Sequence, residues 1–258
     1  MRKRNWSFRS FPFTAAQSAL VELGILFLPG IPALIWLWPR VHGTEWNTLV
    51  QSAVYVYLIA GALFIGLRRW SWDQLGLNRK GIGFALACGA VVILGRLVVL
   101  LATSIPLSFQ LTTLDRIVGE TIFYFLLVGL GEELVFRGLM YRALDEWRGT
   151  HWAIWGSSLG FGLFHLGHGD PTIVVAVFIG ALFAAIRWRT GGIVGLIVVH
   201  ALYDLSVVAM VPDLSMNYLI TQVQIHNWVL VALGYAMMIG TGICLWKAPL
   251  SGTPRHAS

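Results

Sequence analysis

The chain has 258 residues, of which 57% are hydrophobic and only 12% are charged, and its mean hydropathy is +0.73. Soluble domains carry about 25% charged residues, so this composition excludes an ordinary water-soluble protein and indicates a chain embedded in lipid. The net charge of +6 is interpreted as a topology signal and not as a nucleic-acid-binding surface. Cys88 and Cys244 lie inside apolar segments, which argues against a disulfide framework or a thiolate metal site.

Eight apolar segments, bounded by charged residues, Pro or Gly, are predicted to cross the membrane as helices. They cover residues 18–38, 49–67, 81–104, 118–141, 152–167, 171–188, 192–211 and 227–246. Crossing the hydrocarbon core takes about 20 apolar residues, which most of these segments approach. The sequence therefore predicts an all-α, polytopic transmembrane bundle of about eight spans, with residues 1–258 forming a single integral membrane domain. Residues 1–17 and 249–258 are expected to be short cytoplasmic tails.

The basic residues predict how this bundle is oriented. If the N-terminus is cytoplasmic and eight helices follow, fifteen of the eighteen Lys and Arg residues fall on the inner side. Arg40 and Arg116 fall outside, and Arg96 lies within a span. This is the positive-inside pattern, so both termini are expected to face the cytoplasm. The pattern fits a bacterial plasma membrane, and the endoplasmic reticulum would look the same. Membrane lipids are expected partners, and nucleic acid is not.

Ionisable residues occur where lipid disfavours them, beginning in the fourth segment. An ionised side chain at the bilayer centre costs about 2.5–3.5 kcal/mol, so each needs a partner or a function. Glu133 and Arg137 are four residues apart, a spacing that favours an ion pair along one helix face. Glu132 points about 100° away from Glu133. We therefore expect Arg137 to hold Glu133, while Glu132 faces a cavity and acts as a general base.

Two later segments add imidazoles and a third carboxylate. His165 ends the fifth segment, and Phe161, one turn earlier, is expected to pack against its ring. His200 and Asp204 in the seventh segment are again four residues apart and so share a helix face. Clusters of intramembrane ionisable groups indicate functional sites. The candidate catalytic residues are Glu132, His165, His200 and Asp204, with Glu133, Arg137 and Phe161 as supporting residues.

Three motifs in series resemble those of the CPBP family, which comprises CAAX-prenyl endopeptidases, bacteriocin-processing proteins and the Abi group. Residues 132–138 are similar to its E-E-x-x-x-R motif, residues 161–165 to its F-x-x-x-H motif, and residues 200–204 to its H-x-x-x-N or H-x-x-x-D motif. The resemblance covers residues 118–211, the expected catalytic core. It implies an intramembrane endopeptidase that hydrolyses a peptide bond in a membrane-anchored or lipidated, CAAX-like peptide or leader.

The resemblance also implies roles for these residues. Glu132 with His165 would activate a water for attack on a peptide carbonyl, and His200 with residue 204 would stabilise the oxyanion. The family was long classed among metalloproteases, but the favoured mechanism is a glutamate-activated water that requires no cofactor. Zinc is the alternative. If a metal is bound, its expected ligands are Glu132, His165 and His200, although the H-E-x-x-H motif is absent.

Two further questions are open at the level of sequence. An ionised Asp204 would orient His200 and favour its imidazolium form, whereas a protonated Asp204 could itself donate to an oxyanion.

The alternatives to an endopeptidase are a non-catalytic binding or immunity protein that uses the same cavity, and a cation or proton transporter. The sequence shows no matching pair of Gly- or Pro-broken helices in its two halves, which disfavours the transporter.

The depth of the site in the membrane also depends on the helix lengths. Glu132 and His165 would lie at different levels unless the fourth helix continues through Tyr141 to Trp147, or the fifth helix is short and off-centre. Outside the motifs, the first four helices are expected to contribute topology only.

Overall fold

Helices make up almost all of the described chain. The computed structural model describes residues 13–30, 37–41, 44, 46–104, 114–166, 170–208 and 225–247. No β-strand occurs among these residues, which contain only an isolated bridge between Thr103 and Ile225. The predicted all-α class is therefore confirmed. The expected tails, residues 1–17 and 249–258, fall almost entirely outside the described residues.

In its described residues, each of the eight predicted segments corresponds to a helix or to a run of helical elements. Residues 31–36, 167 and 209–211 of these segments lie outside the described residues. Their bounds are α1 (Ala15–Phe27), α3 (Trp38–Val41), α4 (Trp46–Leu67), α5 (Ile82–Leu101), α6 (Leu114–Ile122), η2 (Phe123–Gly129), α7 (Leu130–Glu132), η3 (Glu133–Met140), α8 (Tyr141–Arg148), α9 (Thr150–Phe164), α10 (Asp170–Thr190), α11 (Val194–Val208) and α13 (Trp228–Lys247). The elements from α6 to α8 follow one another without a break. They form one long helix in which η2 and η3 are π-helical.

Within the described part of the chain, four helices are long and apolar enough to cross a membrane: α4, α5, α13 and the Ile173–Thr190 part of α10. Two shorter apolar helices, α1 and most of α11, accompany them. Large apolar side chains point outward from the bundle, such as Val174, which is 70% exposed, and Val229, which is 76% exposed. Such surfaces suit lipid, and helices satisfy their own backbone hydrogen bonds there. The predicted helical membrane protein is confirmed.

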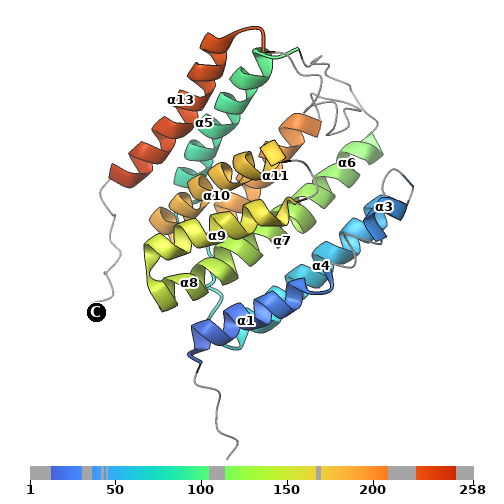
Figure 1. The fold of residues 1–258 in the computed structure, drawn as a ribbon, viewed down its shortest axis with the longest axis vertical. Helices are drawn as coiled ribbons and strands as arrows, with labels where there is room; N and C mark the ends of the chain where they lie inside the picture. Colours follow the sequence, from blue (N-terminus) through green and yellow to red (C-terminus); the bar gives the residue numbers. More distant parts are fainter. Residues whose placement is uncertain are drawn as a thin grey trace, which may run out of the picture.

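The site is framed by the helices at the centre of the bundle. The long helix α6–α8 and helices α9, α10 and α11 lie together, α5 and α13 pair on one flank, and α1 and α4 lie on the other (Figure 1). Helices α5 and α13 approach closely at Gly95 and Gly234. A Cβ at Gly234 would lie only 2.4 Å from the Gly95 carbonyl oxygen. Small residues allow such backbone contact between helices in lipid.

The lengths of two helices answer the question of depth. The fourth predicted helix continues through Tyr141 to Arg148, so Glu132 lies near its middle. Helix α9 is short and ends at Phe164, so His165 follows it within the bundle. The chain reverses between the two at Gly149, whose φ of +86° is a backbone conformation that suits glycine. Both expected explanations apply together.

Candidate active site

The centre of the site is a fully buried ion pair on the long helix. Arg137 Nη1 lies 3.2 Å from Glu133 Oε1, and neither side chain is exposed. Arg137 also donates from Nη2 to the Gly180 carbonyl on α10 at 3.3 Å. Its guanidinium stacks over the Phe161 ring, 4.2 Å from the ring centroid. The expected pairing of Arg137 with Glu133 is therefore present, and it also joins η3 to α9 and α10.

Glu132 faces a different set of neighbours, as its position on the helix predicts. The side chain is only 4% exposed. Its Oε1 accepts a hydrogen bond of 2.6 Å from the Tyr55 hydroxyl. Its Oε2 lies 3.4 Å from His200 Nε2 and has no hydrogen-bond partner among the described residues. The adjacent carboxylates thus differ: one pairs with arginine, and the other bonds Tyr55 and has one oxygen without a hydrogen-bond partner among the described residues.

His200 lies among three carboxylates. Its Nδ1 is 2.6 Å from Glu133 Oε1, and its Nε2 faces both Glu132 Oε2 and Asp204 Oδ2, the latter at 3.6 Å. A carboxylate paired with an arginine only accepts hydrogen bonds, so Nδ1 must carry a hydrogen and donate it to Glu133. The Nε2 distances are longer than a hydrogen bond. His200 is therefore held through Nδ1, while Nε2 makes no close hydrogen bond to either of these two carboxylates.

His165 joins the site through Phe161. Its Nδ1 lies 2.9 Å from the Phe161 carbonyl, which can only accept, so Nδ1 carries the hydrogen. In the tautomer that carries its hydrogen on Nδ1, the other ring nitrogen, Nε2, is the acceptor. The Phe161 ring packs at 4.7 Å from the His165 ring and at 5.9 Å from the His200 ring. Phe161 thus touches both imidazoles as well as Arg137.

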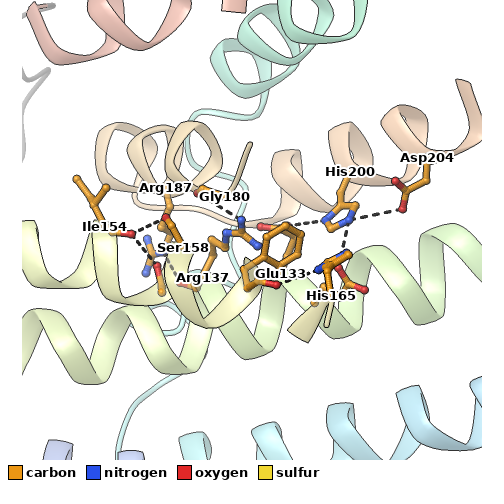
Figure 2. A network of polar contacts seen from close by, with 12 residues as sticks. Glu133, Arg137, Ile154, Ser158, His165, Gly180, Arg187, His200 and Asp204 are labelled. Carbon is orange, nitrogen blue, oxygen red and sulfur yellow. Dashed lines mark hydrogen bonds and ion pairs between the residues drawn. The ribbon is translucent and has the colours of Figure 1, made fainter. Parts of the chain in front are cut away.

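Five side chains of the cluster are joined by ion pairs: Glu132, Glu133, Arg137, His200 and Asp204. Asp204 is the most exposed of them. Its side chain is 27% exposed, against 5% for His200 and 0% for Glu133. It lies close enough to Glu132, Arg96 and His165 to interact with them electrostatically. Figure 2 shows Glu133, His165, His200 and Asp204 gathered in one region with Arg137 beside them. The cluster therefore becomes more exposed from Glu133 toward Asp204.

The structure brings two residues to the site that the sequence did not single out. Tyr55 on α4 bonds Glu132, so the expectation that the early helices contribute only topology is wrong. Arg187, counted among the inner-side charges, is buried and donates to the Arg137 carbonyl at 3.2 Å and to the Gln74 carbonyl at 3.0 Å. Neither residue belongs to a motif. The only signal for each was a polar group within or next to an apolar segment.

Among the residues that the structure describes, no three His, Cys, Asp or Glu side chains converge in a way that could hold a metal ion. The alternative ligand set of Glu132, His165 and His200 therefore does not fit zinc as these side chains lie. The chemistry below is derived from the side chains themselves.

The fold and this cluster define a class of protein: a helical membrane protein with carboxylates and imidazoles buried among its central helices. Residues 115–206 match the family model described as "Rce1-like: Type II CAAX prenyl endopeptidase Rce1-like". The match confirms the predicted resemblance to the CPBP family over the segment that holds all three motifs. This likeness to CAAX prenyl endopeptidases supports an enzyme of the CAAX-protease type. Comparisons with curated proteins and with solved structures gave no match.

Proposed function

We propose that this protein is an intramembrane endopeptidase that cleaves a membrane-anchored or lipidated, CAAX-like peptide with a glutamate-activated water. The observation that supports this most directly is the division of roles between Glu132 and Glu133. Glu133 is neutralised by Arg137, whereas Glu132 keeps a buried oxygen beside His200. A base next to hydrogen-bond donors is what amide hydrolysis requires.

In the proposed reaction, Glu132 and His165 take a proton from a water molecule. The resulting hydroxide attacks the peptide carbonyl carbon, and the carbonyl oxygen gains the negative charge. His200 donates from Nε2 to that oxygen. When the C–N bond breaks, the proton held by Glu132 and His165 passes to the leaving amine. The proton taken from the water molecule thereby ends on the amine product.

Asp204 acts in this proposal as an ionised partner of His200. Its Oδ2 and the Glu132 Oε2 lie on the same ring nitrogen, at 3.6 Å and 3.4 Å. Two nearby carboxylates, together with the bond from Nδ1 to Glu133, favour an imidazolium that can donate from Nε2. Of the two roles that the sequence left open, this geometry supports the orienting carboxylate.

The substrate class follows from the surroundings of the site. Apolar outward-facing helices surround the cluster, so a peptide held in the bilayer by a lipid or an apolar segment reaches it without leaving the membrane. The family match adds CAAX-like, prenylated C-terminal peptides as the first substrates to test. We place the enzyme in a plasma membrane of bacterial type, with membrane lipids around it, on the positive-inside pattern.

The test compares purified wild-type protein in detergent with Glu132→Gln and with Glu146→Gln. Glu146 lies on the same long helix but pairs with Arg142 at its end, away from the cluster. We expect the wild type and Glu146→Gln to cleave a quenched fluorescent peptide with a prenylated C-terminal cysteine motif. Glu132→Gln should lose at least about 100-fold in kcat, because the base is removed. The unprenylated peptide tests whether the lipid is recognised.

The outcome also separates the alternatives. Full activity in Glu132→Gln refutes the proposed mechanism. Peptide binding without cleavage by the wild type identifies a binding or immunity protein that uses the same residues. Ion flux in proteoliposomes that disappears in His200→Ala identifies a transporter.

A further inference from the structure

Tyr55 reaches the proposed base from outside the segment that matches the family. It lies on α4, whereas the match begins at residue 115. Its hydroxyl donates to Glu132 Oε1 at 2.6 Å, which is short for a hydrogen bond between oxygens. Bonds to an ionised acceptor are shorter and about twice as strong as neutral ones. Tyr55 is therefore a principal partner of the Glu132 carboxylate.

The Tyr55 ring is held in place by the long helix. Phe123 packs against it edge to face, with centroids 6.2 Å apart. A Cβ added at Gly131 would lie 3.0 Å from Tyr55 Cδ1, so the ring lies directly against the backbone beside Glu132. A ring fixed on two sides can hold its hydroxyl in one position.

This contact fixes how the Glu132 carboxylate is oriented relative to His200. The last torsion of a glutamate side chain has broad, weakly defined minima, so a carboxylate without a partner samples many orientations. Here Oε1 is held by Tyr55, and Oε2 is directed toward His200 Nε2 at 3.4 Å. Small losses of orientation in a catalytic group cause large losses of rate.

We infer that Tyr55 is a positioning residue for the reaction, which holds the Glu132 carboxylate with one oxygen toward His200 and the attacking water. This role rests on the proposed function. It makes α4 part of the catalytic apparatus, because the base on the long helix depends on a donor from the N-terminal half of the chain.

The variant Tyr55→Phe removes only the hydroxyl. We expect kcat to fall roughly 10- to 100-fold, the range that corresponds to losing a hydrogen bond to a charged group. KM should stay within about twofold, since Tyr55 contacts the base and not the substrate. Tyr57→Phe is the matched control. It lies on the same helix, its hydroxyl bonds the Leu26 carbonyl at 3.1 Å, and its activity should equal that of the wild type.

A second measurement reports on the contact without using activity. Thermal unfolding of wild type, Tyr55→Phe, Glu132→Gln and the double variant forms a double-mutant cycle. We expect Tyr55→Phe to lower the unfolding midpoint in the wild-type background and to have a smaller effect once Glu132 is Gln. Equal effects in both backgrounds would show that the two side chains do not interact, and would overturn the inference.

Two kinetic outcomes also overturn it. One is an unchanged kcat in Tyr55→Phe while Glu132→Gln is inactive, and the other is a raised KM with kcat unchanged, which would place Tyr55 in substrate binding. If the wild type cleaves no peptide, the proposed function fails and the role of Tyr55 with it. The unfolding cycle then shows whether the contact itself is present.

Discussion

Replacing Arg137 by Met is the strongest test of how the cluster is stabilised. The guanidinium is completely buried, and it contacts Glu133, the Gly180 carbonyl and the Phe161 ring. Methionine fills part of the same volume but supplies neither charge nor donor. The variant therefore leaves Glu133 ionised in an apolar interior with His200 as its remaining partner.

The expected loss of stability is large. Removing one partner of a buried ion pair costs about 3–5 kcal/mol, because the buried charge that remains loses its arginine, and here only His200 is left to offset it. The loss of the hydrogen bond to Gly180 adds about 1 kcal/mol. Changing Glu133 to Gln in the Arg137→Met background removes the unpaired charge, so the double variant should recover a substantial part of this loss.

The measurement is the free energy of unfolding in mixed micelles, compared with the free energy for Arg142→Met. Arg142 pairs with Glu146 in the same i, i+4 arrangement on the same helix, but the side chains are 22% and 36% exposed. Exposed pairs contribute about 0.2–1 kcal/mol, so this control should change little. Equal effects of the two substitutions, or a double variant no more stable than Arg137→Met, would refute the view that burial makes the Arg137 pair essential.

Other predictions concern the oxyanion side and the topology. Asp204→Asn should retain more activity than Asp204→Ala, because the amide keeps an oxygen for His200 and adds an N–H for the oxyanion; equal kcat/KM values for the two variants would contradict this. Reporter fusions at both ends should be active only in the cytoplasm, as the positive-inside pattern predicts. A reporter inserted at Thr44, between α3 and α4, should report a location outside the cytoplasm. A cytoplasmic location for Thr44 would overturn the predicted orientation.

The local features of the site were predictable because they depend on short sequence spacing. The four-residue spacing of Glu133 and Arg137 predicts one shared helix face, and the pair forms even though the segment that holds it, η3, is π-helical. The same holds for His200 with Asp204 and for Phe161 with His165. The different directions of Glu132 and Glu133 also followed from the helical period.

Other contacts could not be predicted because they join residues far apart in the chain. Tyr55 and Tyr57 look alike in sequence, and both lie in an apolar segment. Only the packing of α4 against the long helix directs the Tyr55 hydroxyl to Glu132, and only its packing against α1 directs the Tyr57 hydroxyl to the Leu26 carbonyl. Arg187 likewise resembles a cytoplasmic anchor in sequence, yet it is buried against the Arg137 and Gln74 carbonyls.

By itself, the sequence determined the helical membrane class, the order of the helices and the residue types of the cluster, because lipid restricts a chain to apolar helices and makes each buried charge conspicuous. The tertiary structure decided which carboxylate bonds His200 Nδ1, that Tyr55 orients the Glu132 carboxylate, and how far the long helix extends. Those features depend on the packing of one helix against another, for which the periodicity of a single segment carries no information.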